Sequence, residues 1–288
     1  MGVENKIAVR AIIEKPYEAR GKDGILIIQR AVSSSTGPGE WCVPGGKAEG
    51  RELSDAVIDE VLVETSLRFE PDPEPFMEIG PGMEQGYRTF YFIGQANGLV
   101  KLNDESDCFT FAVRENMGRY KFAFPGNLVA ITKYLDEKYM RIAVDEAMKC
   151  RDEDEKLHPK VGAVIVKDGQ VLVKAHRNEN GKGSHAEYWA FKKARERNID
   201  VKGAVLYTTL EPCTVRKENV HETQKVPCAE HIAASGVSHV IIGMLDPNPK
   251  IQQVGFRLLH ELGIRVYVGP LESQVKELNR MFVGKYCH

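Results

Sequence analysis

Three short segments in the second half of the chain carry residues that can bind a transition metal. His185 stands two residues before Glu187, Cys213 closes a Glu-Pro-Cys triplet, and Cys228 follows a proline. One imidazole and two thiolates form the ligand set of a catalytic zinc ion, which keeps its fourth position for water, whereas a structural zinc ion takes four protein ligands. Zinc brings the pKa of that water toward neutrality, and Glu187 is spaced to take its proton and return it to a leaving amine. The pattern therefore predicts the hydrolytic removal of an amino group.

Each of these residues taken alone has a simpler interpretation. A histidine at a helix start is more often a cap or a core residue, and a buried cysteine is usually a small hydrophobic residue. The metal-ligand interpretation is favoured because all three segments fall at the ends of predicted elements. These are a helix over 186–198, a strand over 204–210 and a helix over 228–236.

The rest of the second half also alternates strands with helices. Strands are predicted over 161–166 and 170–175, with a turn at Asp168-Gly169 between them. Residues 237–245 form an apolar run that is typical of a buried parallel strand, and a helix (255–263) and a strand (264–269) follow. This order predicts an α/β/α sandwich.

The His-Ala-Glu, Glu-Pro-Cys and Pro-Cys segments resemble the zinc signature of the cytidine deaminase superfamily, in which the glutamate is the acid/base and not a ligand. Within that superfamily, the riboflavin-pathway pyrimidine deaminases share two further segments, Pro-x-Val-Gly-Ala-Val-Ile-Val at 159–166 and Asp-Pro-Asn-Pro at 246–249. The resemblance covers about residues 137–281 and implies a cytidine deaminase-like α/β/α sandwich. It implies Zn²⁺ at His185, Cys213 and Cys228, catalysis by Glu187, and substrate binding by His176, Asp246 and Asn248.

This half also departs from the riboflavin-pathway family. His158 stands where the family usually has asparagine, and the segment between His176 and His185 is longer. Fourteen residues separate Cys213 from Cys228, more than in the family's stretched form. The resemblance therefore predicts a cyclic amidine deaminase that acts on a small pyrimidine-like nucleotide or base, and it leaves the exact substrate open.

The first half contains a segment, residues 40–49, that resembles the approach to a Nudix box. Residues 59–67 follow the pattern of the box helix, which we predict over 52–67. Glu60 and Glu64 match two of the family's glutamates that hold a divalent cation, Mg²⁺ or Mn²⁺, on a diphosphate substrate. The resemblance implies a Nudix-like α/β/α sandwich with a mixed sheet. Strands predicted over 6–13, 24–30 and 87–94, the first two as a hairpin, agree with it.

Several positions of this box are changed. Val63 replaces a third glutamate, Ser66 replaces a glycine, and Arg51 and Asp59 exchange the signs of the family's helix-bracing pair. When fewer carboxylates hold a cation, its positive charge is less well compensated, so the affinity of the site for the cation should fall. Two alternatives to the deaminase stay open: metal-dependent hydrolysis of a nucleoside diphosphate derivative, and a nucleotide-binding fusion without catalysis.

The chain length of 288 residues favours two domains. Asp136 and Glu137 separate a predicted helix over 127–135 from one over 139–150, so we place the boundary there. The predicted domains are residues 1–136, Nudix-like, and residues 137–288, the zinc-dependent deaminase.

Composition and charge exclude several classes of protein. With 42% hydrophobic and 28% charged residues, the chain is neither fibrous nor disordered. A formal charge of −2 argues against binding of a long nucleic acid, and no apolar run reaches the length of a membrane span, so the expected partner is a small nucleotide or base. Without a signal peptide pattern, the six cysteines are expected as thiols or metal ligands in the cytoplasm. Deaminases that resemble the second half often form homo-oligomers, and the oligomeric state stays open.

Overall fold

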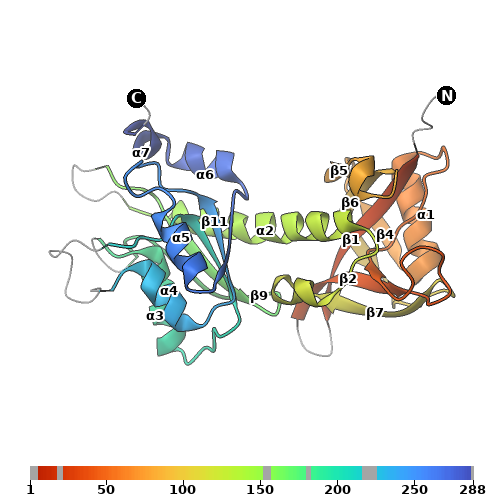
Figure 1. The fold of residues 1–288 in the computed structure, drawn as a ribbon, viewed down its shortest axis with the longest axis horizontal. Helices are drawn as coiled ribbons and strands as arrows, with labels where there is room; N and C mark the ends of the chain where they lie inside the picture. The colour runs from red at the N-terminus through yellow and green to blue at the C-terminus, as the bar shows by residue number, and fades with distance from the viewer. Residues whose placement is uncertain (1–5, 18–21, 152–156, 180–182, 216–225, 287–288) are drawn as a thin grey trace. The chain divides into compact units, whose positions relative to one another are not determined.

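The computed structural model describes residues 6–17, 22–151, 157–179, 183–215 and 226–286. They form two compact units, residues 1–134 and 135–288, each built on its own mixed β-sheet (Figure 1). The expected α/β class is therefore confirmed in both halves. No helix in the described ranges is long and apolar enough to cross a membrane.

The N-terminal unit contains a seven-stranded sheet whose main path runs β3-β2-β1-β6-β4. Strands β1 and β6 pair in parallel, and β1 and β2 form the predicted antiparallel hairpin, with Glu14 opposite Ile25. Strand β5 pairs with β6 and β7 pairs with β2, both antiparallel. The strands are β1 (Ile7–Tyr17), β2 (Lys22–Arg30), β3 (Trp41–Cys42), β4 (Arg68–Pro71), β5 (Met77–Ile79), β6 (Arg88–Asn97) and β7 (Ser106–Ala112).

Helix α1 (Leu53–Thr65) covers one face of this sheet. Its Ala56, Val57 and Val61 are fully buried against Val9 and Ala11 of β1. Because side chains alternate along a strand, Arg10 projects from the opposite face. The helix ends at Ser66, whose φ of 58° is the left-handed conformation that favours glycine, the residue the box usually has there. Two short 3-10 helices, η1 (Pro81–Met83) and η2 (Arg114–Arg119), complete the connections.

A single helix, α2 (Pro125–Ala147), replaces the two helical stretches that the sequence separates at Asp136 and Glu137. Neither residue breaks a helix, and the carboxylate of Asp136 accepts a hydrogen bond from the Tyr207 hydroxyl at 3.1 Å. The buried positions continue every four residues through Leu135 and Tyr139, so the apolar period does not restart. The expected interruption was wrong because two charged residues were treated as a helix break.

The C-terminal unit contains a five-stranded sheet in the order β12-β11-β10-β8-β9. Strands β8 and β9 form a hairpin through Asp168 and Gly169, which both have positive φ, as the sequence predicts. Strands β10, β11 and β12 are parallel, so the carboxyl ends of all three meet at one edge. The strands are β8 (Gly162–Lys167), β9 (Gln170–His176), β10 (Val205–Leu210), β11 (His239–Met244) and β12 (Arg265–Val268).

Helices cover both faces of the second sheet (Figure 1). On one face α3 contacts α4 and α4 contacts α5. Helix α4 joins β10 to β11 and α5 joins β11 to β12, and each is a crossover between neighbouring parallel strands. On the other face α2 and α6 approach Gly243, where an added Cβ would meet Met140 and Val275. The helices are α3 (Ala186–Glu196), α4 (Cys228–Ser235), α5 (Val254–Glu261), α6 (Glu272–Leu278) and α7 (Arg280–Gly284).

Candidate zinc centre

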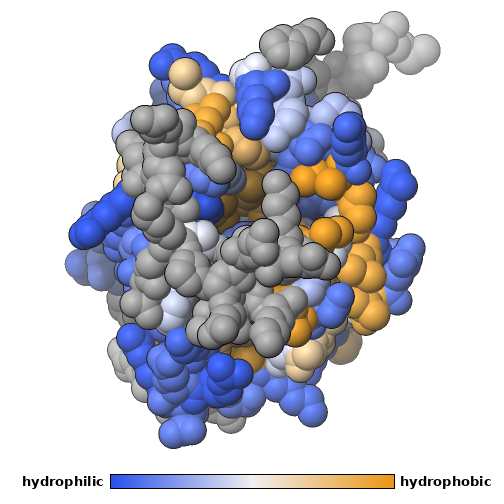
Figure 2. Space-filling view, turned by 90° about the vertical axis from the view of Figure 1, so that its left-hand side faces the viewer, coloured by the Kyte–Doolittle hydropathy of each residue, from blue (hydrophilic) through white to orange (hydrophobic). Residues whose placement is uncertain are grey.

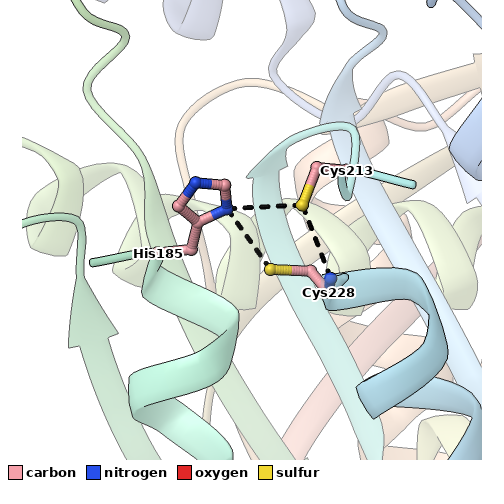
Figure 3. Close-up of side chains that lie close together, drawn as sticks. All are labelled: His185, Cys213 and Cys228. Atoms are coloured by element: carbon pink, nitrogen blue, oxygen red, sulfur yellow. Dashed lines mark hydrogen bonds between the residues drawn. The ribbon is translucent and has the colours of Figure 1, made fainter. Parts of the chain in front are cut away.

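His185, Cys213 and Cys228 come together although they are far apart in sequence (Figure 3). The His185 Nδ1 atom lies 3.5 Å from the Cys213 Sγ and 3.4 Å from the Cys228 Sγ. The three candidate ligand atoms all lie within 4.8 Å of one another. This donor set fits a zinc ion, because imidazole and thiolate are the ligands that zinc prefers.

The local fold places each of these side chains at the end of an element. His185 is the N-cap of α3, Cys213 lies three residues after the fully buried strand β10, and Cys228 is the first residue of α4. The Cys228 amide donates to the Cys213 Sγ at 3.4 Å. Hydrogen bonds from Cys228 and His185 hold the pKa of the Cys213 thiol well below its usual range. Cys213 is therefore prepared to act as a thiolate ligand.

Glu187 lies beside this cluster in the first turn of α3. Only 4% of its surface is exposed, and the Cys228 Sγ lies 3.8 Å from its Oε2. A buried carboxylate that reaches the metal ligands without joining their cluster can exchange protons with a molecule bound there.

A cavity of about 200 Å³ opens beside the cluster. Of the site residues expected from sequence, His185, Glu187, Cys213 and Asp246 line it. Three residues that the sequence analysis did not assign to the site, His158, Arg177 and Glu211, line it as well. In the sequence, His158 stands out only as a departure from the family pattern. Arg177 follows His176 but belongs to no motif that would mark it as a cavity residue.

Glu211 shapes this cavity by fixing the backbone around it. Its carboxylate accepts hydrogen bonds from the amides of Asp246 (3.0 Å), Gln253 (3.0 Å) and Phe256 (3.1 Å). The end of β10 is thereby tied to the loop after β11 and to the start of α5. Burial raises the pKa of Asp246, whose carboxylate accepts a hydrogen bond from the Asn248 amide at 2.8 Å.

Two expected substrate residues are absent from the lining of this cavity, as far as the described residues show. Asn248 lies in the turn after β11, where its side chain accepts a hydrogen bond from the Lys250 amide at 3.1 Å. The His176 Nδ1 lies 3.6 Å from Glu146 Oε2 and has no hydrogen-bond partner. Both roles remain predictions.

Figure 2 shows the end of the C-terminal unit that lies on the left of Figure 1. Apolar side chains gather along one side and in a central hollow of this face, and polar side chains surround them. Small-molecule sites combine apolar walls with a few polar groups in this way.

The two glutamates of the N-terminal box lie in a different environment. Glu64 is 6% exposed and accepts a hydrogen bond from the Gly45 amide at 2.8 Å, and burial raises its pKa to about 7. Glu60 Oε1 receives the guanidinium of Arg51 at 2.9 Å, and the same guanidinium reaches Asp59 at 3.3 Å. The exchanged pair Arg51 and Asp59 therefore makes contact, and Arg51 also holds one of the two expected metal ligands.

A second cavity, of about 650 Å³, adjoins these glutamates. Glu60, Glu64 and Glu84 line it together with Arg10 and Arg30. Glu84 is buried and accepts hydrogen bonds from the Tyr91 and Thr89 hydroxyls at 2.7 and 3.3 Å. The N-terminal unit thus has a cavity of its own, independent of the zinc centre.

Two family models match the chain. Residues 6–123 match the NUDIX domain, and residues 133–244 match the cytidine and deoxycytidylate deaminase zinc-binding region. The second match includes His185, Glu187, Cys213 and Cys228, which supports Zn²⁺ as the metal of the cluster.

The curated relatives match about half of the chain. The riboflavin biosynthesis protein RibD of Aquifex aeolicus is 38% identical over 148 residues, which are 51% of this chain and 38% of the relative. The diaminohydroxyphosphoribosylamino-pyrimidine deaminase of Schizosaccharomyces pombe is 34% identical over 142 residues, 49% of this chain and 33% of the relative. The chain thus spans well under half the length of these relatives. A solved structure of Acinetobacter baumannii RibD aligns with a TM-score of 0.45 at 32% identity, over 54% of this chain and 40% of that one.

Proposed function

We propose that this chain, which joins a NUDIX domain to a cytidine deaminase-type zinc-binding domain, hydrolytically deaminates a small pyrimidine nucleotide of the riboflavin pathway. The observation that carries the proposal is the convergence of His185, Cys213 and Cys228, with Glu187 beside them, next to a cavity that His185, Glu187 and Cys213 line. The name of the Schizosaccharomyces pombe relative supplies the substrate class, a diaminohydroxy pyrimidine with a phosphoribosylamino group. We assign this activity to residues 137–288 and the NUDIX domain to residues 1–136.

In this proposal, His185, Cys213 and Cys228 hold the zinc ion. When bound, zinc supplies a water molecule whose pKa is lowered toward neutrality. The ligands come from three separate elements, so the ion also ties the start of α3, the end of β10 and the start of α4 together.

Glu187 moves the proton. Its carboxylate takes a proton from the attacking water and delivers it to the amino nitrogen of the substrate, so that the carbon–nitrogen bond breaks and ammonia leaves. The ring carbon gains the oxygen of the water, and Glu187 returns to its starting state. The position of Glu187 next to Cys228 and its near-complete burial support this role.

We assign substrate binding to Asp246, Asn248 and His176. Asp246 lines the cavity directly and is held in place through the Glu211 network. Asn248 is fixed two residues away by its backbone hydrogen bond to Asp246, which supports a role at the edge of the same site. His176 ends β9 and directly precedes Arg177, which lines the cavity, and this supports the role that the family resemblance gives it.

The divalent cation, Mg²⁺ or Mn²⁺, expected at Glu60 and Glu64 belongs to a less favoured second function, the hydrolysis of a nucleoside diphosphate derivative. Retention of both carboxylates on the wall of a large cavity supports it. The contact of Arg51 with Glu60 and the loss of a carboxylate at Val63 oppose it.

The proposal also covers the location of the enzyme and its oligomeric state. A reduced zinc thiolate centre is compatible with a cytoplasmic location, because thiols stay reduced there. The edge strand β12 exposes Tyr267 and Val268, which supports association into a homo-oligomer, testable by light scattering.

Ammonia release tests the proposed function. The purified chain is incubated with a panel of aminopyrimidines as bases, nucleosides and nucleotides, including the diaminohydroxy phosphoribosylamino pyrimidine. We expect about one zinc per chain and release of ammonia from the nucleotide. Zinc-loaded protein that releases no ammonia from any member of the panel contradicts the proposal.

A further inference from the structure

The charged side chains around His176 belong neither to the zinc ligands nor to the lining of the zinc cavity. We propose that one of them, Glu146, is a positioning residue that keeps a proton on the Nδ1 atom of His176. The Nε2 atom is then the hydrogen-bond acceptor that meets an N–H group of the substrate. This inference rests on the proposed function, which assigns substrate binding to His176.

The first observation is a buried carboxylate that faces one nitrogen of the ring. Glu146 lies in α2 and is 5% exposed, and its Oε2 atom lies 3.6 Å from the His176 Nδ1. The Nδ1 atom is also buried and has no hydrogen-bond partner. This distance exceeds the hydrogen-bond range, so the interaction is electrostatic. The charge of Glu146 therefore acts more strongly on Nδ1 than on the far side of the ring.

The second observation is that Glu146 is ionised. Burial alone would raise the pKa of Glu146, but Lys149, Lys174 and His176 lower it below its usual range. The Lys149 Nζ donates to Glu146 Oε1 at 2.6 Å, and the Lys174 Nζ lies 3.6 Å from the same oxygen. An ionised carboxylate only accepts hydrogen bonds. It repels a ring nitrogen that carries a lone pair and favours one that carries a proton, so Nδ1 holds the proton.

The other charges near the ring oppose a second proton on it. Glu179 Oε2 lies 3.9 Å from the His176 Nδ1 and also accepts a hydrogen bond from the His176 amide at 3.4 Å, while Glu179 Oε1 pairs with Lys193. Together the ion pairs of the described residues bring two carboxylates and three ammonium groups to this cluster. An excess of positive charge disfavours the imidazolium form. The ring is therefore neutral, and Nε2 keeps its lone pair.

The place of His176 in the fold connects this cluster to the zinc cavity. His176 is the last residue of β9 and lies opposite Gly162 of β8, and the next residue, Arg177, lines the cavity. Within the described ranges, the hydrogen bonds of His176 are formed by its backbone. A lone pair on Nε2 selects an N–H donor, and the proposed substrate carries such donors on its amino groups.

Nitrogen NMR of the zinc-loaded full chain, prepared with isotopically labelled histidine, tests the inference. Ring nitrogens with and without a proton differ in chemical shift, and the His176 signals are those absent from His176→Gln. At the pH of the ammonia assay, we expect the proton on Nδ1, although free histidine prefers it on Nε2. Glu146→Leu removes the carboxylate, so the proton should move to Nε2 and the two chemical shifts should exchange.

Two variants control for general effects of charge. Asp145→Asn changes the exposed neighbour of Glu146 in the same helix and should leave the proton on Nδ1. Glu179→Gln removes the more distant carboxylate and should also leave it there. The unchanged chain decides the test even if Glu146→Leu fails to fold. A proton on Nε2 in the unchanged chain, a proton that stays on Nδ1 in Glu146→Leu, or an equal change in Glu179→Gln would each overturn the inference.

Steady-state kinetics connects the tautomer to the substrate. Glu146→Leu should raise the KM for the diaminohydroxy phosphoribosylamino pyrimidine by about tenfold with kcat nearly unchanged, because one hydrogen bond to the bound substrate is lost. An unchanged KM would overturn the role in substrate binding. The NMR measurement needs no turnover, so absence of ammonia release with the proton on Nδ1 would contradict the proposed function and not the positioning of His176 by Glu146.

Discussion

The two units of this chain each preserve part of a metal-binding motif, and they differ in what surrounds the ligands. In the C-terminal unit, one histidine and two cysteines meet within 4.8 Å, with the carboxylate of Glu187 beside them. In the N-terminal unit, Glu60 is paired with Arg51 and Glu64 is buried against a backbone amide. The first set of ligands is assembled for a metal ion, whereas the second is neutralised by the protein's own groups.

This difference shows that ligand identity is a weaker criterion than ligand availability. Both sets could be selected from sequence by matching residue types. Only the contacts show that the Cys213 thiol has a lowered pKa, which favours the metal-binding thiolate. The pKa of Glu64 is raised, which favours the protonated carboxyl and opposes metal binding.

The largest expected effect separates chemistry from metal binding in the C-terminal unit. Glu187→Gln removes the proton carrier and leaves all three ligands, so we expect the rate of ammonia release to fall by about a thousandfold with zinc content unchanged. Steady-state kinetics and metal analysis on the same sample measure both quantities. Glu230→Gln, on an exposed position of α4, is the control and should match the unchanged chain. A Glu187→Gln variant with a normal rate would assign the proton transfer to another residue.

The next effect tests the ligand set. Cys228→Ser should lower zinc affinity by more than about 100-fold. Loss of a residue that only hydrogen-bonds to a ligand costs up to about 100-fold, and this variant removes a thiolate ligand itself. Competition with a zinc-binding dye measures the affinity. Cys150→Ser, at another cysteine of the same unit, should bind zinc normally. Equal affinities for the two variants would remove Cys228 from the zinc centre.

The buried carboxyl group of Glu64 should make the stability of the N-terminal unit depend on pH. Glu64 has a pKa of about 7 when folded, above its ordinary value of 4.5, so folding favours its protonated form. The stability that this provides is present in full below pH 4.5 and is lost as the pH rises through 7. The loss amounts to as much as about 3 kcal/mol in the free energy of unfolding.

Glu64→Gln should remove this dependence and stabilise the unit above neutral pH. Hydrogen exchange of the amides of α1, measured at about pH 5 and about pH 8, reports the change. Glu52→Gln, an exposed residue next to the same helix, is the control. If hydrogen exchange in the unchanged chain and in Glu64→Gln depends on pH in the same way, Glu64 is not buried in the uncharged state.

The smallest effect is expected from restoring one carboxylate. Val63→Glu should raise the affinity for Mg²⁺ slightly, because it adds a ligand oxygen while Arg51 still holds Glu60. The combination of Val63→Glu with Arg51→Gln should give a larger increase. Calorimetric titration with Mg²⁺ compares the variants. A large gain from Val63→Glu alone would mean that the pairing of Glu60 does not restrict the metal site.

Most of the fold could be predicted from sequence because its patterns are local. The hairpin turn at Asp168-Gly169 and the helix end at Gly236 follow from positive φ values that glycine adopts easily. The continuous helix α2 was missed, because the adjacent charged residues Asp136 and Glu137 were interpreted as a boundary. The apolar positions before and after them belong to one continuous helical face.

The candidate site was predictable to the extent that it depends on motifs. His185, Cys213 and Cys228 stand in recognisable triplets, and the structure brings them together. Arg177 and His158 were missed as cavity residues, since their position depends on how β8, β9 and the chain before β8 pack. The contact of Arg51 with Glu60 was also not foreseen, because the family pattern relates Arg51 to Asp59 and not to Glu60.

Zinc titration into metal-stripped protein tests the central claim most directly. The zinc bound and the ammonia released from the diaminohydroxy phosphoribosylamino pyrimidine are measured on the same samples. We predict that the rate of ammonia release rises in proportion to bound zinc and levels off at about one ion per chain. Ammonia release by the stripped protein, or full zinc loading without ammonia release, would contradict the account.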